Sequence, residues 1–202
     1  VSAFISRVAL RPEGAARYRH WLASGAYGEH QLLWQLFPQG GRAPFLYRWF
    51  EPQSPAFLIS GVAPLPDHPA WRVESKPFAP QLREGDRLAF VLRANATVYR
   101  EGHRHDVVMD ARAHGDARAR LEVANELGLA WLSRQGERHG FALEDGHVSY
   151  YGQLRARGIS VGVMDFEGKL RVTDQESFAL ALVQGVGRAR RFGCGLLLVR
   201  RA

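Results

Sequence analysis

Residues 174–199 read DQESFALALVQGVGRARRFGCGLLLV, and their apolar spacing indicates how the end of the chain folds. The apolar spacing of 174–184 predicts a helix, and Asp174 before it is a residue type that caps helix N-termini. The apolar run 196–199 is typical of a strand buried in a sheet. The stretch therefore predicts a helix, a glycine-rich loop and a strand, the closing αβ unit of a mixed fold.

The loop 185–195 (GVGRARRFGCG) carries four glycines and three arginines. Glycine permits positive φ and close approach of the backbone, and exposed amides beside arginines suit phosphate. The loop follows a helix and lacks Lys-Ser or Lys-Thr, so it is not a Walker loop, and Arg190 stands where a dinucleotide fingerprint needs glycine. We expect this loop to contact the phosphates of a nucleic acid backbone through seven residues: Gly185, Gly187, Arg188, Arg190, Arg191, Gly193 and Gly195. The alternative is a tight turn whose arginines are solvated.

The same order of elements occurs twice along the chain. The order β-α-β-β-α-β in each half predicts two tandem ferredoxin-like (RRM-like) domains with antiparallel sheets, an α+β fold, over residues 1–80 and 81–202. In the first half, the proline-rich segment 64–69 leaves room for only a turn of helix. The predicted elements are strands at 3–9, 45–50, 56–61, 71–78, 87–99, 148–154, 159–166 and 196–199, and helices at 27–37, 117–135 and 174–184.

Composition narrows the partners. The 202 residues carry a formal net charge of +7, and 25 of the 27 basic residues are arginine, because Lys76 and Lys169 are the only lysines. This balance favours an acidic partner such as nucleic acid, although a GC-rich genome would give the same excess of arginine. Cys194 is the single cysteine, which excludes an internal disulfide and a multi-cysteine metal site. No apolar run is long enough to cross a membrane and no signal-peptide layout is present, so we expect a cytoplasmic protein.

The helix predicted at 27–37 presents a histidine outside its core stripe. At 100° per residue, the apolar positions 32, 33, 36 and 37 share one face, whereas Tyr27, His30 and Trp34 form a second stripe. Tyr27 and His30 are neighbours at i, i+3. Because histidine titrates near neutrality, His30 could accept a proton from a ribose 2′-hydroxyl, whose oxygen then attacks the adjacent phosphorus. Arginines or loop amides could neutralise the phosphorane. A histidine with only a structural role is the alternative.

Four motifs occur in the same order as in a known family: YGEHQLLWQLFP at 27–38, LRAN at 92–95, FEG at 166–168 and GVGRARRFGCGLL at 185–197. In these the chain resembles the CasE-type CRISPR RNA-processing endoribonucleases of type I-E systems, over nearly its whole length. The resemblance implies tandem ferredoxin-like domains and metal-independent cleavage of CRISPR precursor RNA at repeat hairpins. It implies 5′-hydroxyl and 2′,3′-cyclic phosphate ends, no cofactor, and retention of the mature crRNA beside other Cascade subunits.

The resemblance also implies roles for individual residues. His30 falls on the family's catalytic histidine and Tyr27 on its partner tyrosine. The loop 185–195 falls on the glycine-rich element, and Arg155 and Arg157, at the tip of the predicted hairpin, fall where basic residues contact the RNA stem. A-form stems are recognised mostly through shape and phosphates, which such a surface suits.

Two features depart from the family pattern. Ala96 follows Asn95 where proline is expected. The segment 100–114 contains His103, His105 and His114, for which we expect a flexible solvated loop, with a metal site as the alternative. Two rival functions stay open from the sequence: a non-catalytic module that binds RNA hairpins, and a small-molecule enzyme that uses the glycine loop for a nucleotide.

Overall fold

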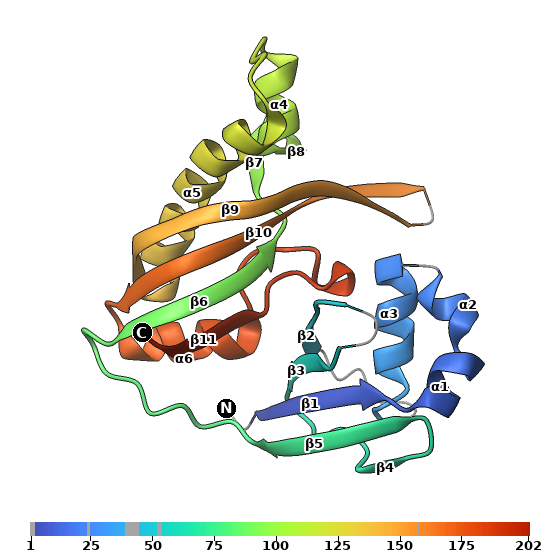
Figure 1. Ribbon diagram of the computed structural model, residues 1–202. Coiled ribbons are helices and arrows are strands. Elements are labelled where there is room, and N and C mark those ends of the chain that lie inside the picture. Colours follow the sequence, from blue (N-terminus) through green and yellow to red (C-terminus); the bar gives the residue numbers. More distant parts are fainter. Residues whose placement is uncertain (1–2, 24, 39–44, 52–53, 157) are drawn as a thin grey trace.

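A computed structural model describes residues 3–23, 25–38, 45–51, 54–156 and 158–202 of the protein. Two antiparallel sheets lie beside one another, each with helices on one side (Figure 1). The chain passes from the first sheet to the second between residues 77 and 87. This arrangement confirms the α+β prediction of tandem ferredoxin-like halves.

The first sheet has the order β2-β3-β1-β5-β4. Without the two-residue β4, this is the strand order of a βαββαβ unit, with each strand antiparallel to its neighbours. The elements are β1 (Phe4–Leu10), α1 (Pro12–Arg17), α2 (Arg19–Leu22), α3 (Gly25–Trp34), β2 (Phe45–Trp49), β3 (Ala56–Ser60), β4 (Asp67–His68) and β5 (Trp71–Pro77).

The prediction of a turn of helix at 64–69 is wrong, because that segment is irregular until β4 begins at Asp67. Three prolines in six residues each remove a backbone donor, which prevents a hydrogen-bonded helical turn. The short helices α1 and α2 were not predicted.

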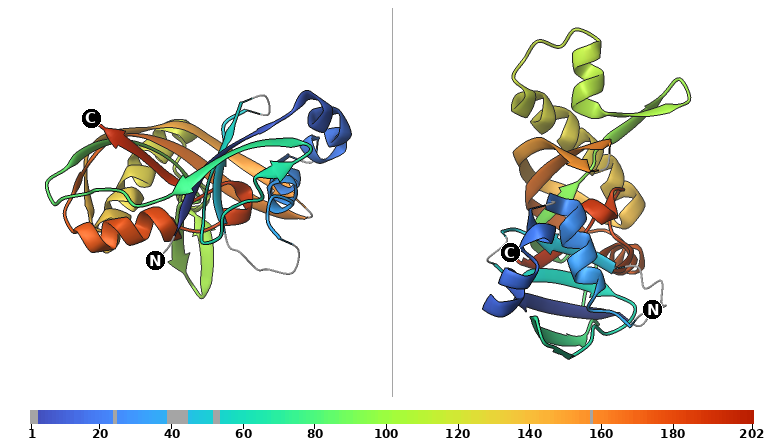
Figure 2. Two further views of the ribbon diagram at one scale, coloured as in Figure 1. Left: turned by 90° about the horizontal axis from the view of Figure 1, so that it is seen from below. Right: turned by 90° about the vertical axis from the view of Figure 1, so that its right-hand side faces the viewer.

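The second sheet has the order β11-β6-β10-β9, again that of a βαββαβ unit. Between β6 and α5 the chain inserts a separate two-stranded ribbon and a helix, which project from the sheet (Figures 1 and 2). The elements are β6 (Arg87–Ala94), β7 (Thr97–Arg100), β8 (His103–Asp106), α4 (Val107–Ala113), α5 (Arg120–His139), β9 (Phe141–Ala156), β10 (Ile159–Val172), α6 (Gln175–Gln184), the 3₁₀ turn η1 (Arg190–Phe192) and β11 (Leu197–Arg201).

The single strand predicted at 87–99 is two strands in different sheets. Asn95 ends β6 because its side chain donates to the carbonyl of Gly162 (2.7 Å), and Ala96 accepts a hydrogen bond from Val107 (3.2 Å). The chain therefore leaves the sheet at Asn95–Ala96. In contrast, the predicted hairpin is longer than expected, since β9 and β10 together cover 141–172 with two register shifts.

The histidine-rich segment is ordered secondary structure, so the expectation of a flexible loop is wrong. His103 and His105 lie on β8, and His114 ends α4. Asp106 caps α4 by accepting from the amides of Val108 and Met109. In the described part of the chain, no three His, Cys, Asp or Glu side chains gather as metal ligands would.

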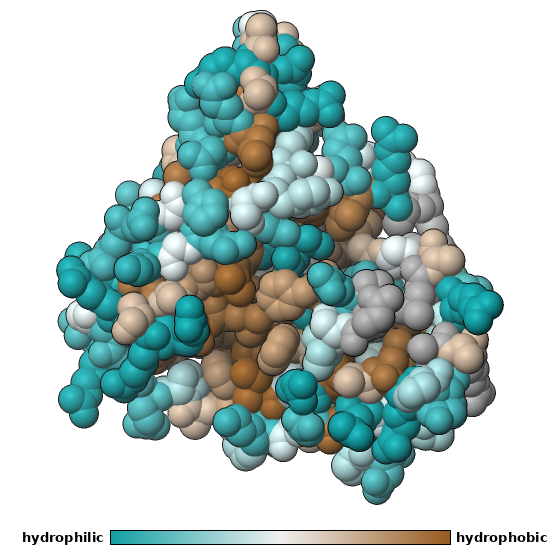
Figure 3. Space-filling view, in the orientation of Figure 1, coloured by the Kyte–Doolittle hydropathy of each residue, from teal (hydrophilic) through white to brown (hydrophobic). Residues whose placement is uncertain are grey.

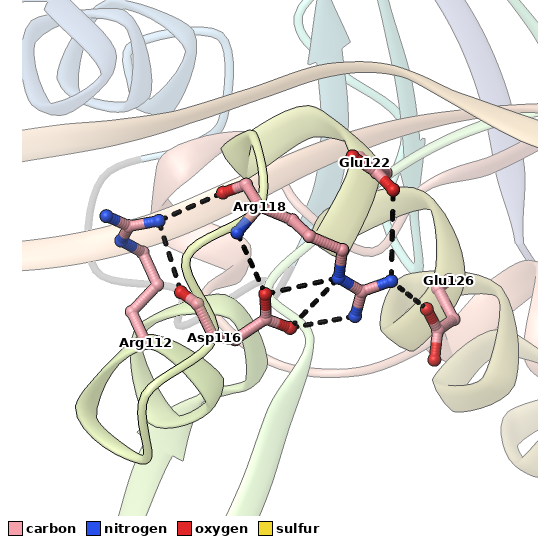
Figure 4. Close-up of polar contacts among 5 residues, drawn as sticks. All are labelled: Arg112, Asp116, Arg118, Glu122 and Glu126. Atoms are coloured by element: carbon pink, nitrogen blue, oxygen red, sulfur yellow. Dashed lines mark hydrogen bonds and ion pairs between the residues drawn. The ribbon is translucent and has the colours of Figure 1, made fainter.

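The predicted helix 117–135 begins three residues later than expected. Arg118 lies in the turn before α5, where it pairs with Asp116 (2.7 Å) and Glu126 (2.6 Å), and Arg112 donates to two carbonyls of the same turn (Figure 4). These contacts fix the turn and delay the helix. The helix then continues to Gly140, whose positive φ (71°) closes its last turn.

A cluster of apolar side chains links the two sheets. Leu46 and Ile59 come from the first sheet and Leu196 from the segment before β11, and all three are buried together. In Figure 3, hydrophobic residues gather at the middle of the face drawn, between the two halves. The two halves are therefore packed against each other. None of the helices described is long and apolar enough to cross a membrane.

Candidate active site

Helix α3 carries Tyr27 and His30 on the side predicted from its periodicity. Leu32 and Leu33 are fully buried against the first sheet, whereas Tyr27 and His30 are half-buried. The helix ends at Trp34 rather than at the predicted Phe37, which lies in the turn after it. The prediction of two separate faces is confirmed by this burial.

The imidazole of His30 rests on the edge of the aromatic core. Its ring stacks on Phe45 of β2, with 5.1 Å between ring centroids and 17° between planes, and Trp34 and Tyr47 are within 5.7 and 6.1 Å. Burial and, to a smaller extent, the positive charge of Arg191 together lower the pKa of His30 to about 4. His30 is therefore a neutral base at physiological pH.

The glycine-rich loop lies against the first sheet. Its four glycines all have positive φ, between 71° and 95°. A Cβ on Gly185 would come within 2.8 Å of Leu46, and one on Gly193 within 3.3 Å of Tyr47. Gly185 and Gly193 are therefore required where the loop of the second half meets β2 of the first.

Most of the glycine amides donate within the protein. Gly185 donates to Ala181 (2.7 Å), Gly193 to Arg190 (3.1 Å) and Gly195 to the carbonyl of Arg93 (2.7 Å). Gly185, Gly193 and Gly195 are buried and Gly187 is half-buried, whereas the side chains exposed on the loop are arginines: Arg188, Arg190 and Arg191. The loop thus presents guanidinium groups from a fixed backbone.

The structure brings the loop to the histidine. Helix α3 contacts η1 directly, and Arg191 in η1 is close enough to lower the pKa of His30. A neutral base and an exposed guanidinium from distant parts of the sequence therefore share one site. Spacing along the chain gave no sign of this pairing.

A largely buried ion cluster crosses the boundary between the two sheets beside α3. Asp165 of β10 accepts two hydrogen bonds from Arg93 of β6 (2.7 and 2.6 Å) and pairs with Arg48 of β2 (3.0 Å). Burial raises the pKa of Glu29 on α3, while the charges of Arg93 and Arg48 oppose that rise. The cluster joins the two sheets, and its arginine charges act on Glu29 of the helix that carries His30.

The long β9–β10 hairpin extends past its sheet on the side where α3 and η1 lie (Figures 1 and 2). Strand β9 also contacts α3. Arg155 is exposed near the end of β9, whereas Arg157 lies outside the described residues. The basic hairpin and the arginine loop thus approach His30 from the same half of the protein.

Chemically, the arrangement offers a neutral imidazole beside a phenol on one helix and cationic groups on a second element. An unprotonated imidazole can accept a proton, and guanidinium groups can neutralise charge that develops on phosphate. An intramolecular transesterification, in which a ribose 2′-hydroxyl attacks the adjacent phosphodiester, requires these groups.

Comparisons with known proteins show the family to which the chain is similar. The family described as CRISPR associated protein matches residues 3–201. The curated CRISPR-associated endoribonuclease Cse3 of Thermus thermophilus is 29% identical, with 85% of this chain and 81% of that protein covered. The Cascade subunit CasE of Escherichia coli is also 29% identical, with 85% and 89% covered.

Solved structures give the same result for the fold. Thermus thermophilus Cse3 bound to an RNA representing a pre-cleavage complex superposes with a TM-score of 0.79 at 26% identity, covering 99% of this chain and 100% of that one. Since the family match spans almost every residue, the chain belongs to the CRISPR-associated protein family, among its CasE-type members.

Proposed function

We propose that the protein is an endoribonuclease that cleaves CRISPR precursor RNA at repeat stem-loops and holds the mature crRNA for a Cascade complex. The single observation that carries the proposal is the neutral imidazole of His30 beside the exposed guanidinium of Arg191. Relatives named as an endoribonuclease and as a Cascade subunit support the substrate and the partner. The cytoplasm is the expected place of action.

In the proposed reaction, the RNA supplies its own nucleophile. His30 takes the proton of the ribose 2′-hydroxyl, and the freed oxygen attacks the neighbouring phosphorus. The P–O5′ bond breaks with its electron pair on the departing oxygen, which takes up a proton from water and becomes a 5′-hydroxyl, and His30 returns its proton to water. The other product ends in a 2′,3′-cyclic phosphate.

The remaining residues have supporting parts in this proposal. Tyr27, one turn before His30 on α3, orients the attacking hydroxyl or stabilises the charge that develops. Arg191 offers two N–H donors in one plane to the phosphorane. The route requires no metal ion, because a base and a charge stabiliser come from side chains.

Recognition of the stem is proposed to come from exposed basic side chains. Arg155 on the hairpin and Arg188 and Arg190 on the loop are exposed and can contact phosphates, and Arg157 is assigned to the same surface from the resemblance. The glycines of 185–195 serve this surface by letting the loop pack on β2. Stem phosphates are the main handle that A-form RNA offers to protein.

The proposal is tested by cleavage of a cognate repeat hairpin in EDTA with end-group analysis. The wild-type protein should leave a 5′-hydroxyl and a cyclic phosphate, and a 2′-deoxy substitution at the attacking ribose should block cleavage. His30→Ala should lower the single-turnover rate by roughly 10²- to 10⁴-fold, the contribution typical of a general base, with RNA affinity nearly unchanged.

His139→Ala is the matched control, since His139 is a half-buried histidine on α5 whose pKa is also lowered, first by burial. It should cleave like the wild type. Intact RNA with the wild-type protein in EDTA and in added Mg²⁺ would support the alternative, a module that binds RNA hairpins without cutting them.

A further inference from the structure

Tyr47 lies where helix α3, which carries His30, meets the glycine-rich loop, which carries Arg191. It lies on β2 and is fully buried. Its ring is 6.1 Å from the His30 ring and 6.0 Å from Phe45, between centroids. Tyr47 therefore belongs to the aromatic cluster against which the imidazole packs, although it lies in none of the sequence motifs.

The hydroxyl of Tyr47 faces two backbone carbonyls from different halves of the protein. It donates toward Ala26 in the first turn of α3 (3.1 Å) and toward Arg191 in η1 (3.2 Å). A phenol has one proton, so the two carbonyls share it. The two acceptors are 165 residues apart in sequence yet meet at one atom.

The loop is shaped to reach this hydroxyl. Gly193 has a φ of 71°, and a Cβ there would come within 3.3 Å of the Tyr47 ring. Ala189, just before η1, also has a positive φ (61°), an uncommon conformation for a residue with a side chain. The backbone around Arg191 is thus held in a strained turn against the tyrosine.

The tyrosine is suited to hold position rather than to exchange protons. Burial raises its pKa well above the ordinary value, and the nearby charge of Glu29 adds to the rise. Its proton therefore stays on the oxygen at physiological pH, and the hydroxyl remains a donor.

We infer that Tyr47 is a positioning residue: its hydroxyl joins α3 to η1 and so fixes the distance between the imidazole of His30 and the guanidinium of Arg191. The inference rests on the proposed function, because it deepens the account of that site. Without the hydroxyl, the ring still fills its space, but the carbonyls of Ala26 and Arg191 lose the shared donor. The loop is then free to shift away from the helix.

The test compares Tyr47→Phe with Tyr151→Phe. Tyr151 is the matched control because its hydroxyl makes a partly buried hydrogen bond to Asp106 (2.9 Å), in the second half of the protein. Both variants lose one hydroxyl and keep the ring. The readouts are the pKa of His30 by NMR in the RNA-free protein, the single-turnover cleavage rate, the affinity for the repeat hairpin, and the unfolding midpoint.

Tyr47→Phe should raise the pKa of His30 above its wild-type value of about 4, because Arg191 moves away. Cleavage should slow by roughly ten- to a hundredfold, the loss that a small misplacement of reacting groups causes. RNA affinity should change less than the rate. Tyr151→Phe should lose similar stability and change neither the pKa nor the rate.

The inference is overturned if Tyr47→Phe leaves the pKa of His30 unmoved, or if both variants slow cleavage equally. The pKa measurement needs no RNA and no activity. A wild-type protein that fails to cleave would therefore refute the proposed function while the link between Tyr47, Arg191 and His30 could still be measured.

Discussion

The pKa of His30 links its surroundings to the rate of the proposed reaction. Burial against Phe45 and Trp34 opposes protonation, and Arg191 opposes it further, so the folded-state pKa of about 4 lies below the usual value. The neutral form is therefore available throughout the physiological range. A bound phosphate brings negative charge, which favours protonation and raises the pKa within the complex.

We predict the pH dependence of kcat/KM from this shift. Because kcat/KM reports the free enzyme, its acid limb should fall near pH 4, whereas the limb of kcat should lie higher. Arg191→Gln removes a positive charge near the imidazole, so the pKa of His30 should rise while burial keeps it below 6.5. NMR titration of the imidazole measures this directly.

Arg188→Gln is the control for that titration. Arg188 is an exposed arginine of the same loop, but its charge does not contribute to the lowered pKa of His30. Equal rises of the pKa in both variants would contradict the assignment to Arg191. No rise in either would show that burial alone sets the value.

Single-residue features were predictable where they depend on helix geometry. The spacing of 100° per residue was enough to separate Leu32 and Leu33 from His30 on α3. The partners of His30 were not predictable in the same way. Phe45, Tyr47 and Arg191 reach it through the fold, and a sequence pattern reports only neighbours along one element.

At the scale of elements, the glycine-rich loop has a structural reason for its glycines. The sequence predicted an anion-binding turn, and the structure places three of the four glycines in buried contacts. Positive φ was foreseeable from residue type. The surface that the glycines approach was not, because β2 lies some 140 residues earlier in the chain.

We predict that Gly185→Ala destabilises the protein more than Gly102→Ala. Both glycines have nearly the same φ (82° and 80°), but a Cβ on Gly185 would meet Leu46 and the carbonyl of Gly195 within 2.9 Å, whereas nothing lies within 4 Å at Gly102. The positive φ should cost about 1–3 kcal/mol in each variant, and Gly185 also has a ψ of 158°, a combination that is nearly restricted to glycine. Overpacking should cost about 1–3 kcal/mol more at Gly185.

Urea unfolding gives the two free energies. The Gly185 variant should also cleave more slowly, since a displaced loop moves Arg191 away from His30. Equal losses of stability in the two variants would show that the loop can move away from β2 without cost.

At the scale of the whole molecule, the repeated order of elements predicted both sheets and their antiparallel strands. The order of elements could not predict how the two sheets are oriented relative to each other. Their orientation depends on side chains at the boundary between them, and these side chains share no sequence motif. Arg48, Arg93 and Asp165 come from three strands, and Glu29 from a helix. Their cluster and the apolar seam at Leu46 set the orientation that brings α3 beside η1.

We predict that Asp165→Asn weakens the protein by about 3–5 kcal/mol, the cost of leaving buried charges without their partner. Arg48 and Arg93 would then face each other across the seam, and one nitrogen of Arg48 already has no partner. Glu144→Gln is the control. Glu144 also pairs with two arginines, Arg87 and Arg171, but these side chains are more exposed, so the loss of both ion pairs should destabilise the protein by about 1 kcal/mol or less.

The pH dependence of stability distinguishes the loss of charge at Asp165 from a change of packing. Burial opposes ionisation of Asp165, yet the hydrogen bonds from Arg93 and the charge of Arg48 hold its pKa below the ordinary value. Its contribution is therefore complete above about pH 4 and is lost as pH falls through the lowered folded-state pKa. The difference between wild type and Asp165→Asn should shrink below pH 4, whereas a pure packing defect would leave it constant; denaturant unfolding at pH 7 and at pH 3 measures both values.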